Sequence, residues 1–426
     1  MWLPDLADAA WVHDVLSRHA ETLGVDGDVA STRLVDVRLT NPHRPESSRC
    51  RGWATYVVAV RGCPSVQLYL KGFPERASSE DAWRRDRADR PQGRSVHLAE
   101  HDLVVWRFPE DPQLPALPDL LASPLSPHVV PAAVGAVLGP RSQLHVTVVR
   151  YQPEASATLR VEGVQAGGPT AFAKHLGDGS VEDVAARHRA LWNVMGPGEP
   201  LRVAEPLAAD PVHRVLWTRG VPGLTLTDAV PASELTGATG PIGALLAALH
   251  GSGIGPMPTL SVDGLLTEMS KKAGKLIHAH PAVEPIVSDL LAAAARRHSD
   301  VTRERACALH GDVHLDQLVA SPDGPVLVDL DTIVQGPPEV DLAEFLVDLA
   351  LRALPEGVAE EVADQLLTSY VAATGAGVDA ALLAVCADAE FMNRCYRHLR
   401  RHTPGWQQDL EVELSRHGDV ARLLGG

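Results

Sequence analysis

The chain has few aromatic residues, no long apolar run and no leader-type start. Aromatic residues make up 4% of the 426 residues, while the hydrophobic share of 45% is ordinary for a globular protein. No stretch of about 18 apolar residues occurs, so we expect no membrane span. The first residues lack a basic segment followed by an apolar one, so no secretory signal is expected. These absences favour a cytoplasmic protein. The length of 426 residues is enough for two or three domains.

Cysteine and positive charge are also scarce. The five cysteines are scattered without metal-ligand spacing, so we interpret them as reduced thiols. There are 38 Lys and Arg against 54 Asp and Glu, which gives a formal net charge of −16. An acidic surface repels nucleic acid and anionic lipid, so we expect neither as a partner. It would favour a cationic substrate such as an amino sugar, although the net charge does not describe any single pocket.

Residues 309–345 combine short apolar runs with clusters of polar residues. The runs 318–319 and 325–328 predict two short strands, and Ser321-Pro322-Asp323-Gly324 between them has the composition of a tight turn. The predicted hairpin would bring the residue before its first strand close to the residue after its second.

Three oxygen-bearing side chains fall at the ends of this hairpin. Gln317 precedes the first strand, Asp329 ends the second, and Asp312 lies on the loop that leads in. Phosphoryl transfer needs a carboxylate that orients or deprotonates a hydroxyl, and hard oxygen ligands for Mg²⁺. We therefore predict Asp312 as the base, with Gln317, Asp329 and also Asp331 as metal ligands. The alternative is a polar hairpin whose acids are incidental.

The order of these motifs resembles the aminoglycoside phosphotransferase superfamily, small-molecule kinases with a protein-kinase-like fold. The matching residues are His310-Gly311-Asp312-x-His314-x-x-Gln317, Val328-Asp329-x-Asp331 and Pro338-x-x-Asp341-Leu342-Ala343. The resemblance implies Asp312 as base, Asp329 and position 317 as metal ligands, and ATP with Mg²⁺ as partners. Position 317 is usually Asn, and Gln occurs in the maltokinase-like and glucosamine-kinase-like branches, which we take as the nearest. The resemblance is specific from about Gly139 onward.

The resemblance implies an α+β, bilobal, protein-kinase-like fold. We expect an N-terminal cap module over residues 1–125, a small β-rich nucleotide lobe with its hinge over 126–222, and a large helical lobe with the catalytic loop over 223–426. Strand patterns dominate the first two segments, and helical patterns dominate from Pro241 onward.

The two β-rich segments share a short pattern. Pro45-Glu46-Ser47-Ser48 precedes a predicted hairpin that ends at Lys71, and Pro153-Glu154-Ala155-Ser156 precedes one that ends at Lys174. The pattern is either chance or a duplication, in which case the cap copies half of the nucleotide lobe. The second hairpin lacks a glycine-rich loop, so its Pro-Glu-Ala-Ser turn would cover the phosphates.

Lys174 closes a predicted strand, where its ammonium can reach nucleotide phosphates. The alternative is an edge lysine without a functional role. A kinase-like site needs a Glu on the next helix to hold this lysine, but the predicted helix 181–194 has His188 at that place. Glu182 and Asp183, in the first helical turn, are the candidate replacements.

The segment after the strand 215–217 is rich in Gly and Pro, as expected for a hinge between lobes. We expect backbone groups of Thr218, Gly220 and Val221 to pair with adenine. The alternative is an ordinary loop.

Two further groups of residues complete the predicted site. His310 and His314 are expected to brace the catalytic loop, and the resemblance adds Asp341 to this group. Because C-terminal helices wall the acceptor site in this fold, we also predict an acceptor-site role for four residues that share a helix face: Glu390, Asn393, Arg394 and Arg397.

The sequence thus predicts an ATP- and Mg²⁺-dependent phosphotransferase acting on a hydroxyl of a small molecule, namely a sugar, amino sugar or aminoglycoside. Three alternatives stay open: a Ser/Thr kinase acting on a peptide in a modified-peptide pathway, a non-catalytic nucleotide-binding scaffold, and a metal-dependent hydrolase. The missing helix Glu and glycine loop motivate the scaffold. No pattern identifies the acceptor, the oligomeric state, or a choice between ATP and GTP.

Overall fold

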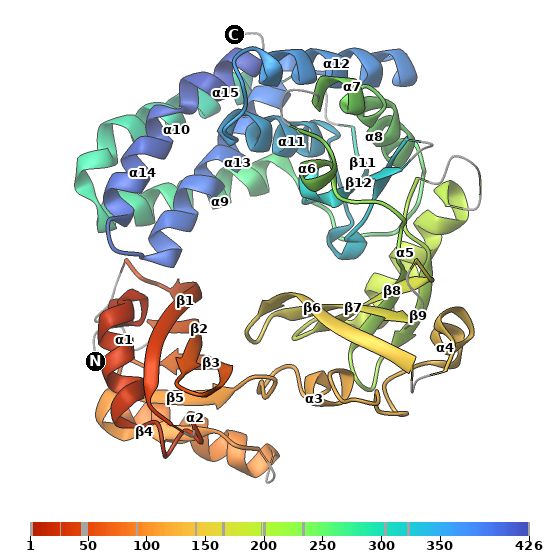
Figure 1. Ribbon diagram of the computed structural model, residues 1–426. Coiled ribbons are helices and arrows are strands. Elements are labelled where there is room, and N and C mark those ends of the chain that lie inside the picture. Colours follow the sequence, from red (N-terminus) through yellow and green to blue (C-terminus); the bar gives the residue numbers. More distant parts are fainter. Residues whose placement is uncertain are drawn as a thin grey trace.

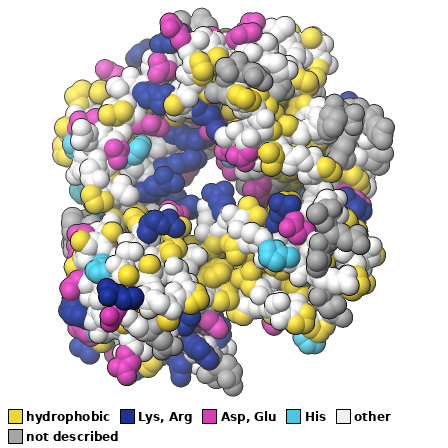
Figure 2. Space-filling model, in the orientation of Figure 1, with side chains coloured by type: hydrophobic (Ala, Val, Ile, Leu, Met, Phe, Trp, Pro, Cys, Tyr) yellow, Lys and Arg dark blue, Asp and Glu magenta, His cyan; other side chains and the backbone are white. Residues whose placement is uncertain are grey.

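The chain forms three regions arranged in a ring around a central hollow, as the computed structural model shows (Figures 1 and 2). An N-terminal β-region, the cap, leads into a second β-region, and a helical lobe closes the ring by contacting the cap. The structure describes residues 3–25, 27–43, 50–90, 93–140, 143–163, 167–196, 198, 202–231, 235–301, 305–321 and 324–424.

The cap is an antiparallel sheet with the strand order β1-β2-β3-β5-β4 and a helix on each face. Its strands are β1 (Val29–Thr40), β2 (Arg51–Val60), β3 (Cys63–Gly72), β4 (Val96–Leu98) and β5 (Leu103–Arg107). Along β3, Leu68 and Leu70 pack into the core that includes α1 (Ala9–Arg18), while Tyr69 packs with Trp83 of α2 (Arg76–Asp89). This alternation follows from the two-residue period of a strand.

The second sheet repeats this architecture, with the order β6-β7-β8-β10-β9. Its strands are β6 (Leu144–Gln152), β7 (Ser156–Gly163), β8 (Thr170–Leu176), β9 (Pro206–Asp210) and β10 (Val215–Arg219). A helix follows the third strand in both sheets, α2 in the cap and α5 (Val181–Met195) here. The shared order and helix position favour duplication over chance, although Pro45–Ser48 lie outside the described residues.

The segment between the two sheets packs onto the second one. It contains α3 (Leu117–Leu120) and α4 (Ala132–Leu138). Leu114, Leu117 and Leu125 are buried in one core with Val161 and Trp217 of the second sheet. The predicted boundary at residue 125 therefore lies too far along the chain, because apolar burial assigns the residues from Leu114 onward to the second region.

The helical lobe has one large apolar core, to which α8, α11 and α13 contribute many buried residues. Its helices are α6 (Leu226–Ala229), α7 (Leu235–Thr239), α8 (Ile242–His250), α9 (Val262–Ala279), α10 (Glu284–Ser299), α11 (Glu339–Leu351), α12 (Val358–Thr374), α13 (Ala380–Arg401), α14 (Trp406–Ser415) and α15 (His417–Leu423). The last two of these helices, α14 and α15, are separated at Arg416. Within the described residues, no helix has the length and apolarity needed to cross a membrane.

The hairpin expected in the 309–345 stretch is present. β12 (Leu318–Ser321) pairs with β13 (Gly324–Leu327), and Pro322 and Asp323 of its turn lie outside the described residues. A second small sheet pairs β11 (Cys307–Leu309) with β14 (Val334–Gly336), which the sequence analysis did not anticipate. Three residues are too few to establish a period.

Two segments bridge to this hairpin, the connection from α5 to β9 and the connection from β10 to α6. Val203 forms a parallel bridge with Leu327, and Thr225 forms an antiparallel bridge with Val319. Gly223, at φ 130°, lies so close that an added Cβ would sit 2.2 Å from a backbone oxygen of β12. The hairpin is therefore the joint that fixes the second sheet against the helical lobe.

Candidate active site

Lys174 of β8 contacts the two carboxylates that follow β13. Its ammonium donates to Asp329 and forms an ion pair with Asp331 at 2.8 Å, although Lys174 and Asp329 are 155 residues apart in the sequence. The Lys174 side chain is 17% exposed. The fold thus brings together the predicted phosphate-binding lysine and two of the predicted metal ligands.

The charges in this cluster adjust to each other. Burial would lower the pKa of Lys174, but the two adjacent carboxylates raise it above its usual value, so the side chain is an ammonium. Burial would raise the pKa of Asp329, but the charge of Lys174 lowers it. Burial and the neighbouring Asp329 raise the pKa of Asp331. One ammonium faces two acids, so the cluster has an affinity for further positive charge.

Gln317 and Asp329 provide a donor set suited to Mg²⁺. Gln317 ends the single turn of 3₁₀ helix before β12. Its Nε2 lies 3.4 Å from Asp329 Oδ2. Asp329 has a left-handed backbone, φ 61°, which is uncommon for a residue other than glycine and is often found at functional sites. Carboxylate and amide oxygens are the hard ligands that Mg²⁺ prefers. The chemistry of these side chains therefore fits the ion.

A buried carboxylate holds the predicted catalytic loop. Asp341, at the start of α11, accepts hydrogen bonds from the backbone N–H groups of His310 (2.8 Å) and Gly311 (2.9 Å) and lies 3.1 Å from His250 Nε2. The other ring nitrogen of His250 lies 2.9 Å from the Tyr370 hydroxyl. Asp341 thus has the bracing geometry predicted for it, the His310 Nε2 lies 2.9 Å from the Val328 carbonyl oxygen, and His250 is part of the same brace.

Asp312 lines a pocket between the regions of the ring. This interlobe pocket has a volume of about 660 Å³, and its wall includes Asp312, His314 and Asp316 of the loop, Gln152 of β6 and Arg38 of β1. No hydrogen bond or ion pair among the described residues uses the Asp312 carboxylate. It is therefore free to accept a hydrogen bond from a molecule in the pocket.

Below the loop, Glu344 of α11 accepts a hydrogen bond from Val313 N at 3.2 Å. Burial raises the pKa of Glu344 well above its usual value, and Asp341 and Glu390 raise it further. Glu344 thus supports the loop from below, and the sequence analysis did not single it out.

The predicted acceptor residues on α13 divide into two layers. Asn393, Arg394 and Arg397 line the interlobe pocket. Glu390 lies behind them, with Arg394 Nε donating to it at 2.7 Å and Asn393 Nδ2 at 2.9 Å. Glu390 therefore orients the other side chains.

The helix acid of a kinase-like site is absent from α5. His188 is buried and its Nε2 lies 2.8 Å from the Ala204 carbonyl oxygen, and burial lowers its pKa to about 4. Glu182 and Asp183 are exposed and contact Ser180 at the helix N-terminus. The suggestion that Glu182 or Asp183 holds Lys174 is therefore wrong, because the first turn of α5 directs them to solvent; Asp331 holds it instead.

The predicted hinge is partly occupied by the sheet. Thr218 pairs with Phe172 and Pro206, and the Gly220 N–H donates to Thr170 O at 2.8 Å. The N–H of Gly220 is thus unavailable to adenine, which corrects that part of the prediction. Val221 lies beyond the strand and stays a candidate.

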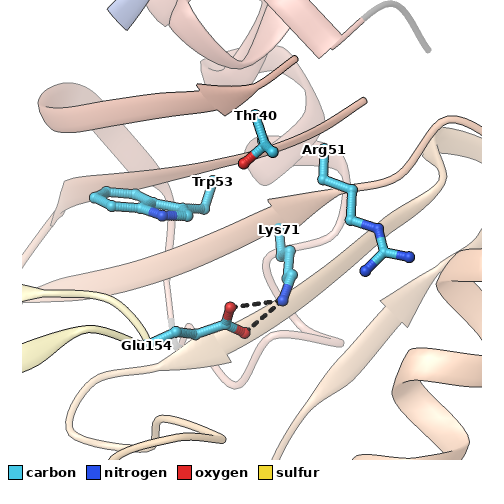
Figure 3. Close-up of a pocket in the computed structure, with 6 residues that line it drawn as sticks. Thr40, Arg51, Trp53, Lys71 and Glu154 are labelled. Carbon is cyan, nitrogen blue, oxygen red and sulfur yellow. Dashed lines mark hydrogen bonds and ion pairs between the residues drawn. The ribbon is translucent and has the colours of Figure 1, made fainter. Parts of the chain in front are cut away.

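The β6–β7 turn is held from three sides. Asp111 accepts hydrogen bonds from the Glu154 N–H (2.9 Å) and the Tyr151 hydroxyl (2.8 Å). Lys71 of the cap donates to both carboxylate oxygens of Glu154 at 2.6 Å, as Figure 3 shows. An added Cβ on Gly177 would lie 2.0 Å from Glu154 O. The turn is rigid, unlike a glycine-rich loop, and it is attached to the cap.

Several cations of the interlobe pocket were not predicted. The end of α13 contributes Arg400 and Arg401. β1 of the cap adds Arg38, and β6 of the second sheet adds Arg150. The run of basic residues near the end of α13 was visible in the sequence. Its convergence with β1 and β6 depends on closure of the ring.

Comparisons with known proteins give one family match. The family model described as "Phosphotransferase enzyme family" matches residues 154–381, more than half of the chain. A search of curated protein sequences found no match.

Three solved structures show the level of similarity. A thermostable mutant of aminoglycoside phosphotransferase APH(4)-Ia, in a ternary complex with ADP and hygromycin B, has a TM-score of 0.49 and 13% identity over 66% of this chain and 95% of that chain. A choline/ethanolamine kinase family protein from Mesorhizobium loti has a TM-score of 0.45 and 17% identity over 70% and 96%. Choline kinase LicA from Streptococcus pneumoniae has a TM-score of 0.44 and 10% identity over 66% and 93%.

Proposed function

The chain belongs to the phosphotransferase enzyme family, and we propose that it transfers the γ-phosphoryl group of ATP to a hydroxyl of a small molecule. One observation carries this proposal: Lys174 of the second sheet meets Asp329 and Asp331 of the hairpin. A cation for the phosphates and carboxylates for their metal are the parts that this reaction requires. A hairpin with incidental acids would not account for this contact.

In the proposed reaction, Asp312 accepts a hydrogen bond from the acceptor hydroxyl and takes its proton late, because the transition state is loose. The acceptor oxygen bonds to the γ-phosphorus as the bond from that phosphorus to the β–γ bridging oxygen breaks, and ADP leaves with the electron pair. Lys174 balances charge on the phosphates, and we assign Asp331 to hold it. Mg²⁺, when bound by Gln317 and Asp329, supplies neutralisation of the phosphate charge.

The shape of the interlobe pocket favours a small acceptor over a peptide. Its volume of about 660 Å³ lies within the range of small-molecule sites, about 300–1,000 Å³. Residues of the cap, the second sheet and the helical lobe all contribute to its wall, which leaves less room for an extended chain than a groove open at both ends.

A thermal shift and a transfer assay test this function. Mg-ATP at about 100 times its Kd should stabilise the full chain by about 2.7 kcal/mol. The same chain should consume ATP in the presence of a hydroxyl acceptor. Asp329→Asn should reduce the Mg²⁺-dependent part of the shift, because it removes a ligand charge. The absence of a shift would favour the hydrolase, and a shift without transfer to any acceptor would favour the scaffold.

A separate prediction concerns the tether between Lys71 and Glu154. Lys71→Met removes the cation that holds the β6–β7 turn, so we expect the KM for ATP to rise about fivefold, equivalent to about 1 kcal/mol for a half-buried ion pair. Asp111 still holds the turn, so the chain should remain folded. Lys271→Met is the control, because Lys271 pairs with Glu268 at the same distance of 2.6 Å on an exposed helix surface. An unchanged KM for ATP in Lys71→Met would show that the turn does not contribute to nucleotide binding.

A further inference from the structure

Positive charge gathers at the interlobe pocket of a chain whose net charge is −16. Figure 2 shows Lys and Arg side chains around the central hollow. Besides Arg394, six Lys and Arg side chains line the pocket and come from all three regions of the ring: Arg38, Arg150, Lys272, Arg397, Arg400 and Arg401. The same wall carries the carboxylates of Asp312, Asp316 and Asp348, so its Lys and Arg side chains outnumber its acidic ones.

Most of these cations lack a carboxylate partner. Within the described ranges, no carboxylate oxygen lies within 4.0 Å of Arg150, Lys272, Arg400 or Arg401. Lys272 donates to the neutral side chain of Asn393, at 2.9 Å. Their charge is therefore not neutralised by the protein itself.

The two remaining cations have distant partners. Arg38 lies 3.6 Å from Asp36, and Arg397 lies 3.7 Å from Glu390. Glu390 is also engaged at 2.7 Å by Arg394, which has a second carboxylate partner in Asp348. Arg394 is thus the neutralised member of the wall, and the cations around it retain excess charge.

These cations repel one another. Burial lowers the pKa of Arg38, and Arg400, Arg150 and Arg401 lower it further. Burial also lowers the pKa of Lys272; the charges of Glu390 and Glu268 raise it, and those of Arg397 and Arg400 lower it. Like charges brought together from three regions destabilise the closed ring unless an anion binds between them.

The charge lies on the acceptor side of the site. The wall of the interlobe pocket includes Asp312 but neither Lys174 nor Asp329. Arg150 and Arg38 are contributed by β6 and β1, and the other cations by α9 and α13. The nucleotide phosphates have their own cation in Lys174, so the pocket cations are available for the second substrate.

We propose, on the basis of the proposed function, that the acceptor is a small hydroxyl compound that carries a phosphate or carboxylate group. Arg400 and Arg401 bind the anionic group, because planar guanidinium groups match phosphate and carboxylate geometry and stay charged. Arg38 contributes from the cap, so the cap completes the acceptor site. The hydroxyl then faces Asp312, and the product carries one phosphoryl group more than the acceptor.

Calorimetric binding to the full chain without ATP tests the charge preference. The probes are matched sets in which one hydroxyl scaffold differs only in charge: glucose, glucosamine, glucuronate and glucose 6-phosphate, and likewise inositol against inositol monophosphate and ribose against ribose 5-phosphate. Within at least one set, the anionic member should bind at least tenfold more tightly than the neutral or amine member. Comparison of glucuronate with glucose 6-phosphate separates carboxylate from phosphate. Equal or better binding of neutral or amine members, or no binding by any anionic member, would overturn the proposal.

Variants locate the effect. Arg400→Ala/Arg401→Ala removes two exposed side chains and should weaken binding of the preferred anionic probe about 10- to 100-fold, while the KM for ATP stays unchanged. Arg296→Ala, on the exposed surface of α10, is the matched control. It should change neither the binding of the anionic probe nor the KM for ATP. Anion binding without phosphoryl transfer would refute the proposed function but support an anion site in the pocket. Transfer to a neutral or amine acceptor, with an unchanged acceptor KM in the double variant, would support the proposed function but refute the anionic acceptor.

Discussion

Asp312→Asn should lower turnover by about 10²-fold or more, because an amide cannot accept the proton of the acceptor hydroxyl. The carboxylate faces the interlobe pocket and has no hydrogen-bond or ion-pair partner among the described residues. The amide has the same shape, so the loop should keep its structure. Steady-state turnover with a fixed acceptor, together with the thermal shift from Mg-ATP, measures both properties.

The same loop provides the control for this variant. Asp316 is four residues further on, lines the same pocket and pairs with Arg352 at 2.9 Å and His314 at 3.4 Å. Asp316→Asn removes an equal charge next to the same substrate, so a purely electrostatic effect would appear in both variants. Turnover retained by Asp312→Asn, or an equal loss in Asp316→Asn, would rule out the specific role of Asp312 as base.

Asp341→Ala should lower the free energy of unfolding by about 3–5 kcal/mol, the usual result of removing one partner from a buried charged pair. Asp341 is fully buried, and its loss leaves the N–H groups of His310 and Gly311 and the ring of His250 without their acceptor. Buried donors without a partner cost about 1–3 kcal/mol each. Chemical denaturation of wild type and variant measures the difference.

The pH dependence distinguishes this brace from simple loss of packing. Burial would raise the pKa of Asp341, but the hydrogen bond and charge of His250 lower it below its usual value. A lowered pKa stabilises the folded state above the unfolded value of about 3.9, and this stabilisation is lost as the pH falls through the folded value. The difference in the free energy of unfolding between wild type and Asp341→Ala should therefore become smaller below about pH 4. Asp364→Ala, on the exposed face of α12, is the control and should have the same free energy of unfolding as wild type at every pH. If the stability difference for Asp341→Ala does not depend on pH, the loss comes from packing.

The cap does more than separate the other regions. The cap shares the strand order of the second sheet, and two of its side chains reach the other regions of the ring. Lys71 holds the turn that carries Glu154, and Arg38 reaches the pocket that Asp312 faces. If the two proposals hold, the cap acts on both substrates of the reaction.

Local patterns in the sequence determined the elements and the order of the motifs. The apolar runs and the turn composition around residues 318–328 predicted β12 and β13, and the motif that contains Asp312 and Asp329 indicated the family. These inferences succeeded because hydrophobic period and turn chemistry act over a few residues. The strands β11 and β14 were missed because three residues carry no period.

Only the tertiary structure decided which charges meet. Lys174 and Asp331 are far apart in the sequence, and their contact explains how a site without a helix glutamate still holds its lysine. The arginines of the interlobe pocket likewise come from β1, β6 and α13, so the acidic net charge of the chain does not describe this pocket. Net charge is a sum over the whole chain, whereas the field in a pocket depends on distance, and only closure of the ring sets those distances.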